Sequence, residues 1–436
     1  MEEVKIVLTQ KQTFKKYAWF TLLGFSLMYG FVYNGRFNME WALPQMMKEL
    51  DWSKSEIGWI TSLIYCGYSV GNFVNGRLGE IYGCKRFILA GVLLTIMTNW
   101  IVSFSTSIVI IAALWGANGY FQSMIWAPGM SLISKWWPSH QRGFAAGFAH
   151  GFSGMAHIIL WLSILLTEWI APSWGWKGIF RIPVTLLLLM ASFYWMMSKE
   201  QPGDVYLDAY EEQDGEIRQK EKDYYRLVLQ KGKLFPYRCL FSQWRFCIWC
   251  LISALASIAR YGLLTWIPLY YAEQMQLHIR TGIFHVLILP TGMTMGTFLV
   301  PWATDKFFGK NRAPAVIICG ALSALLVFIF PSMTTSITVA VSIFWAGFFV
   351  YGINGVLWPY AIDVGTRAFA GTAAGILDWS AYMGAAVQAM VFGSILDKTE
   401  KWAYVFVSIA ILCVLIVILG IIVTEHKEEN EIRKAA

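Results

Sequence analysis

The stretch NGRLGEIYGCKR, residues 75–86, combines three glycines, one acid and three bases between two long apolar segments. A related stretch, PWATDKFFGKNR, occupies residues 301–312. Its Asp305 lies 225 residues after Glu80, and each acid is followed by a glycine and then by basic residues. A motif that occurs twice at a long interval indicates an internal repeat.

Two further landmarks keep nearly the same spacing. Arg142, in QRGFAAGFAHG, is followed 225 residues later by Arg367 in TRAFAGTAAG, and Arg36 is followed 224 residues later by Arg260. Landmarks that stay in register predict that the two halves of the chain are copies with the same topology.

The composition places this repeat in a membrane. Of the 436 residues 57% are apolar, only 14% are charged, and 22 are Trp, which is far from the composition of a soluble domain. A helix needs ~20 apolar residues to cross the hydrocarbon layer of a bilayer. The sequence therefore predicts an all-α membrane protein with twelve spanning helices, at about residues 17–45, 57–78, 87–106, 108–134, 144–167, 176–197, 244–271, 282–303, 313–331, 336–363, 368–394 and 402–424.

These helices divide into two sets of six. We expect an N-terminal six-helix bundle over residues 1–197, a cytoplasmic linker over 198–243, and a C-terminal six-helix bundle with a cytoplasmic tail over 244–436. The linker mixes acids and bases without an apolar run, and some of it is expected to form an amphipathic helix. Lys and Arg gather before the first helix, in the two repeated loops and after the last helix, so both termini should face the cytoplasm.

The charge and the histidines argue against other classes of protein. The net charge of +7 follows from basic residues at the inner membrane face, which does not indicate nucleic-acid binding. The six histidines are scattered and form no His-x-x-x-His pair on a helix. An enzyme embedded in the membrane would need a nucleophile with its base or a metal cluster. We therefore expect no enzyme activity, no metal and no cofactor.

The first helix contains FVYNGRFNMEWALP, residues 31–44, with Arg36 inside an apolar segment. An Arg at the centre of a membrane helix costs about 2.5–3.5 kcal/mol on insertion scales, so it is a functional-site hypothesis by default. Arg260 stands at the equivalent position of the second half. Guanidinium groups bind carboxylate or phosphate through paired hydrogen bonds and stay charged. Two facing each other predict a site for a small anion of up to two charges; the alternative is snorkelling to an interface.

Parallel six-helix repeats with substrate held between the halves are the architecture of the major facilitator superfamily. The loop at residues 75–86 resembles the glycine-acid-glycine-basic signature of that superfamily. Its glycines allow a tight cytoplasmic turn, and its acid can accept hydrogen bonds from helix ends and bases. The alternative is a solvated basic loop. The candidate gate residues are Gly76, Glu80, Gly83, Arg86 and, in the second half, Asp305.

Nearly the whole chain resembles the organophosphate:phosphate antiporters, which include bacterial glycerol-3-phosphate and hexose-phosphate carriers. The resemblance is most specific in RFNMEWALP, ARYGLLTWIPLYYAEQ, WWPSHQRGFAAG and AGTAAGILDWSAYMGAA. It implies that Arg36 and Arg260 bind the substrate phosphate and that the protein lies in a bacterial inner membrane. It also implies a cavity lined by Tyr29, Tyr33, Tyr68, Tyr351 and Tyr382. Without the resemblance, each Tyr could instead be an interfacial or packing residue.

The chain also departs from that family. The glycerol-3-phosphate branch carries a Lys on helix 2 where this chain has Asn72, which lowers the positive charge of the cavity. His150 on helix 5 is a further candidate substrate residue, and its alternative role is a hydrogen bond to a neighbouring helix. Glu40 and Asp378 lower the charge again and are candidates for coupling: either acid could pair with an arginine or carry a proton, since burial raises a carboxyl pKa.

The sequence thus predicts a carrier for small organic anions that works by alternating access, most simply an exchanger of an organophosphate for inorganic phosphate. The alternatives are proton-coupled uptake of a carboxylate or another organic acid, and a receptor with the fold of a transporter. We expect a monomer in the lipid bilayer whose partners are the anionic substrate and either phosphate or protons.

Overall fold

In the computed structural model, residues 2–52, 54–207, 231–274, 279–309, 311–333, 336–399 and 401–424 are described, and these are helical with short connections. The chain forms two compact units. The first unit comprises Met1–Ala145, Met155–Lys233 and Ile362–Trp379. The second comprises Ala146–Gly154, Leu234–Ala361 and Ser380–Ala436. Most of the expected linker helix and the C-terminal tail lie outside the described residues.

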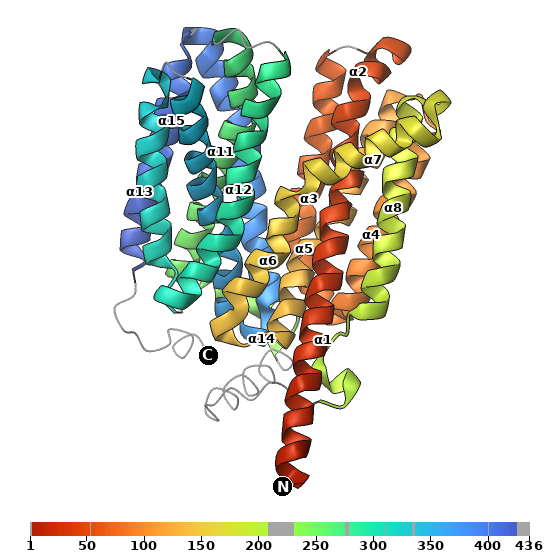
Figure 1. Cartoon of the computed structure of the whole chain (residues 1–436), viewed down its shortest axis with the longest axis vertical. Helices are drawn as coiled ribbons and strands as arrows, with labels where there is room; N and C mark the ends of the chain where they lie inside the picture. The colour runs from red at the N-terminus through yellow and green to blue at the C-terminus, as the bar shows by residue number, and fades with distance from the viewer. Residues whose placement is uncertain are drawn as a thin grey trace. The chain divides into compact units, whose positions relative to one another are not determined.

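The first unit is built on helices from the first half of the chain. Its central helices pack closely, α3 and α4 both against α5, and α1 against α8. Figure 1 shows α1 running beside α8 and extending beyond it toward the N-terminus. The elements are α1 (Glu2–Val32), η1 (Tyr33–Gly35), α2 (Asn38–Leu50), α3 (Lys54–Tyr82), α4 (Cys84–Val102), α5 (Ile108–Trp136), η2 (Ser139–Gln141), α6 (Arg142–Gly154), α7 (Ala156–Ile170), η3 (Pro172–Trp174), α8 (Trp176–Met197) and η4 (Pro202–Val205).

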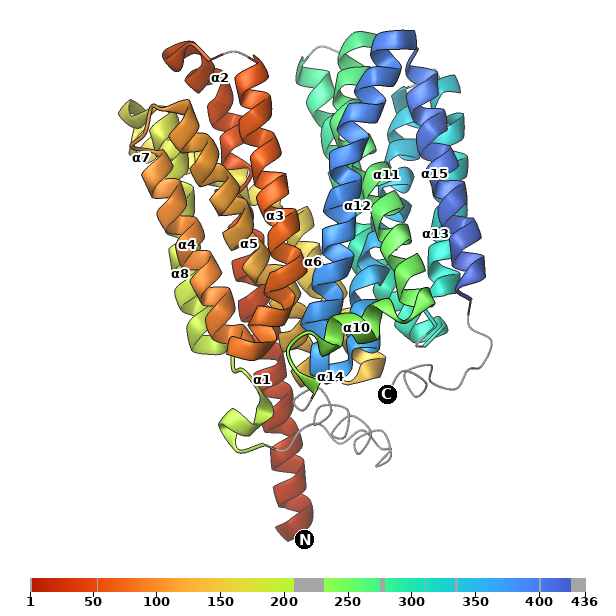
Figure 2. The same ribbon diagram turned by 180° about the vertical axis from the view of Figure 1, so that it is seen from behind.

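The second unit is built mainly on helices from the second half. Here α15 packs against α13 and α11, and the short α10 contacts the beginning of α11 (Figure 2). The elements are α10 (Phe235–Phe241), α11 (Trp244–Gln274), α12 (Ile279–Phe307), α13 (Ala313–Ile329), η5 (Phe330–Ser332), α14 (Ser336–Thr399) and α15 (Trp402–Ile422).

The helices reproduce the predicted spans. Eight stretches in the described part are long and apolar enough to cross a membrane. The other four predicted spans coincide with α1, α3, α12 and the second part of α14, which are long helices with more polar residues. The two spans predicted at 336–363 and 368–394 form one element, α14, with a kink at Thr366 and Phe369 where the backbone leaves helical geometry.

The first predicted span is interrupted. It consists of α1, the single 3-10 turn η1 and α2, and the break lies at Tyr33–Phe37. The backbone N–H groups of Arg36 and Phe37 both donate to the Tyr33 carbonyl, at 3.0 and 2.9 Å. The turn therefore tightens at the break, and the carbonyl of Gly35 is left for partners outside its own helix.

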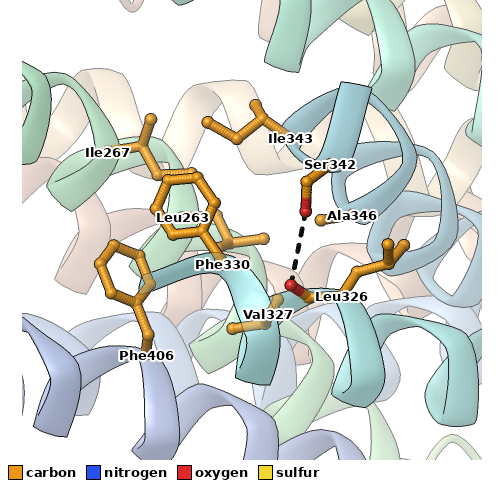
Figure 3. Close-up of a pocket in the computed structure, with 9 residues that line it drawn as sticks. All are labelled: Leu263, Ile267, Leu326, Val327, Phe330, Ser342, Ile343, Ala346 and Phe406. Carbon is orange, nitrogen blue, oxygen red and sulfur yellow. Dashed lines mark hydrogen bonds between the residues drawn. The ribbon is translucent and has the colours of Figure 1, made fainter. Parts of the chain in front are cut away.

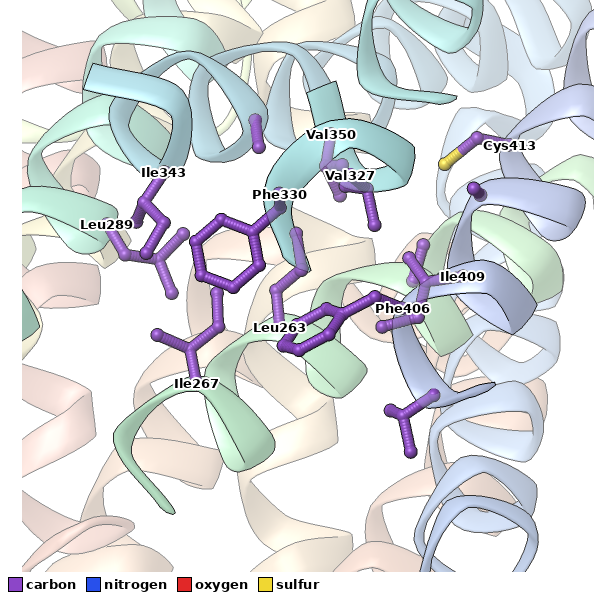
Figure 4. Packing of buried hydrophobic residues seen from close by; sticks show 14 of the residues in the cluster. Leu263, Ile267, Leu289, Val327, Phe330, Ile343, Val350, Phe406, Ile409 and Cys413 are labelled. Carbon is purple, nitrogen blue, oxygen red and sulfur yellow. The ribbon is translucent and has the colours of Figure 1, made fainter. Parts of the chain in front are cut away.

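The core of the second unit is apolar. Side chains from α11, α12, α13, α14 and α15 pack together, among them Leu263, Phe330 and Phe406 (Figure 4). A cavity of about 10 Å³ remains between them, close to the minimum that holds one water. Figure 3 shows its apolar lining and Ser342, whose Oγ already donates to the carbonyl of Leu326 at 3.4 Å. This cavity is a packing void rather than a ligand site.

Candidate functional site

The break in the first span is held open by three side-chain amides. Asn118 and Gln122 of α5 donate to the carbonyl of Gly35 at 2.7 and 2.8 Å, and Asn99 of α4 donates to it at 3.3 Å. All three amide side chains are buried. A buried carbonyl without a partner costs about 1–3 kcal/mol, so this convergence of donors makes the interrupted helix stable.

Arg36 sits directly at this break and is only 7% exposed. Its Nε donates to Oε1 of Gln122 at 2.7 Å, so one carboxamide fixes both the arginine and the Gly35 carbonyl. The guanidinium lies 4.1 Å from the ring centre of Tyr68 and 5.0 Å from that of Tyr33. Gln122 is a neutral acceptor, and it therefore orients the guanidinium without cancelling its charge.

The predicted tyrosines of the first half gather around Arg36. The hydroxyls of Tyr29 and Tyr33 are 3.0 Å apart, and the ring of Tyr29 lies 4.6 Å from the ring of Trp126. Tyr68, on α3, is buried beneath the guanidinium. The structure thus brings together the aromatic face that the sequence spacing predicts.

The second arginine lies in an unbroken helix, α11, and is 6% exposed. Its Nη1 donates to Oδ1 of Asn354 on α14 at 3.2 Å. The guanidinium is 4.4 Å from the ring centre of Tyr261 and 5.4 Å from that of Tyr351, and Tyr261 is followed at 6.1 Å by the ring of Tyr382. Arg260 therefore repeats the pattern of Arg36: a carboxamide acceptor and tyrosine rings.

His150 belongs to this second cluster. Its Nε2 and Oδ1 of Asn354 are 3.0 Å apart, and its ring lies 5.6 Å from that of Trp358. Both residues are on α14, one turn apart. The hydrogen bond to a neighbouring helix that we considered as the alternative role is present, and it leads to the partner of Arg260.

The two acids differ in their surroundings. The one-turn relation expected between Arg36 and Glu40 assumed a continuous helix, but the break intervenes and Glu40 is an exposed residue of α2. Among the described residues its carboxylate forms no hydrogen bond or ion pair. Asp378 is 4% exposed, lies in the same compact unit as Arg36 and interacts electrostatically with Tyr68. Asp378 is therefore the acid nearer to the Arg36 cluster.

The sequence gave no reason to select Gln122, Asn354 or Tyr261. Polar amides within helices are common packing groups, and only the fold shows which of them meets an arginine. A spacing signal existed for Tyr261, which adjoins Arg260 in the chain. Asn72, predicted as a substrate residue, is fully buried where the second part of α14 packs on α3: a side chain at Gly375 would lie 2.3 Å from the Asn72 carbonyl.

We expect Gln122→Met to weaken anion binding about tenfold. The substitution conserves size but removes the acceptor of Arg36, and a hydrogen bond to a charged group contributes about 1.5–3 kcal/mol, where 1.4 kcal/mol is a factor of ten. Titration of purified protein with inorganic phosphate measures the effect. Asn118→Leu is the matched control, because Asn118 supports the Gly35 carbonyl without contacting Arg36. Equal losses in both variants would assign Gln122 to the helix break alone.

Glu80 occupies the position that the repeated loop predicts for a gate. Its carboxylate accepts hydrogen bonds from the backbone N–H and the hydroxyl of Thr372, both at 2.8 Å, and pairs with Arg77 at 3.0 Å. Thr372 begins the second part of α14, after the kink. Glu80 therefore caps a helix start with a carboxylate, which satisfies free N–H groups and complements the helix dipole.

Glycine lets α3 and α14 touch at this point. A Cβ on Gly76 would lie 2.1 Å from the carbonyl oxygen of Gly371, so any larger residue would force the helices apart. Phe73 and Trp379 continue the contact with ring centres 5.5 Å apart. Gly83 has a positive φ of 90°, the conformation that a tight turn between α3 and α4 requires.

The remaining charges of the loops are also paired within their units. Arg142 lies 3.7 Å from Asp363, a partner expected from the sequence, and donates to the carbonyl of Trp137 at 3.3 Å. Asp305 forms an ion pair with Arg312 at the start of α13. Arg86, by contrast, is exposed.

An unexpected residue, Glu200, closes the other side of this loop. The backbone N–H groups of Cys84 and Lys85 donate to its carboxylate at 3.0 and 2.6 Å, and Lys135 forms an ion pair with it. Glu200 thus caps the start of α4 from the segment after α8. Burial would raise the Glu200 pKa, but the Lys135 charge and the backbone N–H groups outweigh burial and hold the pKa below its ordinary value.

We expect Glu200→Gln to lower thermal stability at pH 7 but not in acid. Because the folded protein holds the Glu200 pKa below its ordinary value of 4.5, the carboxylate stabilises the fold above that pH, and this contribution is lost as the pH falls through the folded-state pKa. Unfolding midpoints in detergent at a series of pH values measure it. Asp204→Asn, in the exposed turn that follows, is the control. A loss that is independent of pH would contradict the electrostatic account.

Comparison with known proteins decides the family. Residues 25–389 match the sequence profile of the Major Facilitator Superfamily. The chain belongs to this superfamily. Its members are transporters rather than enzymes, and the fold agrees: the Escherichia coli fucose:proton symporter FucP is similar with a TM-score of 0.72 at 13% identity, over 94% of this chain and 100% of that one.

Curated relatives of this superfamily member cover its whole length. A probable hexose phosphate transport protein of Chlamydia pneumoniae is 26% identical over 100% of this chain and 98% of its own length. The membrane sensor protein UhpC of Escherichia coli is 26% identical over 89% of this chain and 88% of its own length. The chain is therefore an integral membrane protein with the twelve-helix fold of the superfamily, as the sequence predicted.

Proposed function

We propose that this protein is a secondary active transporter that exchanges a small organophosphate for inorganic phosphate. The observation that carries the proposal is the pair of arginine clusters, one in each compact unit. Arg36 and Arg260 are each buried, each oriented by a neutral carboxamide and each stacked on tyrosine rings. Both retain a charge that a bound anion can neutralise.

The chemistry of the clusters suits a phosphate group. A planar guanidinium binds two oxygens of a phosphate at once, and tyrosine hydroxyls can donate to the remaining oxygens. Two arginines match an anion of up to two charges. The hexose-phosphate relative supports a phosphorylated organic substrate.

Exchange follows from the cost of burying charge. Closing an empty site around guanidinium groups removes them from water, and this desolvation is expensive unless an anion compensates it. A bound phosphate or organophosphate therefore permits the change between outward-open and inward-open states, while the empty carrier resists it. Such a carrier exchanges one anion for another in alternating access.

The runner-up is proton-coupled uptake of an organic acid. Asp378 is buried in the same unit as Arg36, and Glu40 begins α2 after the helix break. An acid that takes up a proton when the anion binds would couple transport to a proton gradient. In the exchanger, the same acids only adjust the charge of the arginine site.

A receptor is the third candidate, and the sensor among the relatives is the observation that favours it. A sensor would keep the arginine clusters but would bind its anion without moving it. We place the protein in a bacterial inner membrane as a monomer, with both termini in the cytoplasm.

Purified protein in lipid vesicles tests the proposal. With phosphate inside, we expect rapid uptake of labelled phosphate and of labelled hexose or glycerol phosphate, no dependence on an imposed pH gradient, and no uptake into vesicles without internal anion. Uptake into anion-free vesicles driven by external acid would overturn the exchanger in favour of the symporter. Binding of the same anions without any flux would identify a receptor.

A further inference from the structure

Asn354 joins two candidate substrate residues. It lies on α14 and is 0% exposed. Its Oδ1 is 3.2 Å from Nη1 of Arg260 and 3.0 Å from Nε2 of His150. A single amide oxygen thus accepts from α11 on one side and from α6 on the other.

The chemistry of arginine fixes the orientation of this amide. A guanidinium has donors only, so the atom of Asn354 that faces Arg260 must be the oxygen. It follows that Nε2 of His150, which faces the same oxygen, carries a hydrogen and donates. The Asn354 side chain therefore presents its acceptor to the protein, and its NH₂ group points elsewhere.

That NH₂ group has no hydrogen-bond partner among the described residues. A buried donor without a partner costs about 1–3 kcal/mol, and such groups in native proteins call for an explanation. The neighbouring Tyr351, one turn earlier on α14, is partly exposed and stacks on Arg260. The donor therefore lies beside the arginine at the accessible edge of the cluster.

We infer that Asn354 is a substrate-binding residue that selects a phosphate group over a carboxylate. Its oxygen holds Arg260 and His150 in place, and its NH₂ group donates to an oxygen of the anion bound at Arg260. The inference rests on the proposed function, because it requires an anion at Arg260.

The selectivity follows from the shapes of the two anions. A carboxylate has two oxygens in one plane, and the planar fork of Arg260 engages both. A phosphate is tetrahedral, so two oxygens can occupy the fork while a third lies out of that plane, within reach of a second donor. Asn354 adds a hydrogen bond only to the tetrahedral anion.

Two variants of Asn354 separate this role from a structural one. Asn354→Leu conserves size but removes the acceptor and the donor. Asn354→Asp keeps an acceptor for Arg260 and His150 but replaces the NH₂ group with a charged oxygen. If Asn354 only links helices, the Asp variant should bind anions normally. If it donates to the anion, both variants lose binding, and the Asp variant loses more.

The measurement is the affinity of purified full-length protein for inorganic phosphate and for malonate, by calorimetry. For Asn354→Leu we expect phosphate affinity to fall about tenfold, the effect of one hydrogen bond to a charged group, and malonate affinity to change about twofold or less. Ser342→Ala, which removes a buried hydrogen bond elsewhere in the same unit, should change neither.

Equal losses for the two anions in the Leu variant, or normal phosphate binding by either variant, would overturn the inference. Should the Leu variant not fold, the Asp variant decides alone: phosphate binding near wild type refutes a donor role, and strong loss in a folded protein supports it. Failure of the proposed function looks different, because wild-type protein would then bind malonate more tightly than phosphate or bind neither.

Discussion

Arg36→Lys and Arg260→Lys should each reduce substrate transport by ~100-fold or more while protein levels stay near normal. Lysine keeps the positive charge but lacks Nε and the planar fork. At position 36 it would lose the bond to Gln122 and the stacking on Tyr68, and at position 260 the bond to Asn354. Losing two or more charge-assisted hydrogen bonds at about 1.5–3 kcal/mol each accounts for the size of the effect.

Uptake of labelled phosphate by vesicles loaded with phosphate measures this loss. Arg181→Lys is a matched control, because Arg181 also lies in a membrane helix but donates to Ser103 and stacks on Phe104 at 4.4 Å, away from the candidate site. We expect it to transport normally. Near-normal uptake by either Arg36→Lys or Arg260→Lys would remove that arginine from the substrate site.

Glu80→Ala should lower turnover by ~10- to 100-fold and change substrate affinity less than about threefold. The carboxylate joins α3 to the start of the second part of α14 through Thr372 and holds Arg77. Losing one or two hydrogen bonds to a charged group, at about 1.5–3 kcal/mol each, shifts the balance between conformations. Because these contacts are remote from the arginines, the conformational steps slow and binding is preserved.

The partner residue offers a graded control for this prediction. Thr372→Ala removes the hydroxyl but keeps the backbone N–H that also donates to Glu80, so its turnover should fall less. Thr372→Ser restores the hydroxyl and should restore turnover. Exchange rates and phosphate affinity, measured on the same preparations, separate the two effects. Wild-type turnover in Glu80→Ala would reduce the loop to a solvated turn.

Glu40 shows where reasoning from spacing stops. Counting residues placed it one turn beyond Arg36, on the same face of one helix. The break at Tyr33–Phe37 changes the direction of the following residues, and its stability depends on Asn99, Asn118 and Gln122, which are 64 to 87 residues away in sequence. No local pattern in residues 31–44 contains that information.

The carboxamides illustrate the same limit. Arg36 and Arg260 could be selected from the sequence because charge in an apolar segment is costly and therefore rare, and their near-constant spacing doubled the signal. Gln122 and Asn354 carry no such signal, since a buried amide is inexpensive wherever it finds partners. Their importance comes from the single contact that each makes with an arginine.

The sequence alone determined that this is a twelve-helix membrane protein with an internal repeat, which two buried arginines it depends on, and where its loop acid lies. Burial in lipid imposes long apolar helices, and a repeat imposes spacing, so both are written locally. Only the tertiary structure decided that the first helix breaks at Arg36, that Thr372 and Glu200 cap the loop around Glu80, and that Asn354 joins Arg260 to His150. Hydrogen bonds between helices depend on how the helices pack, because a partner at 3 Å can be hundreds of residues distant.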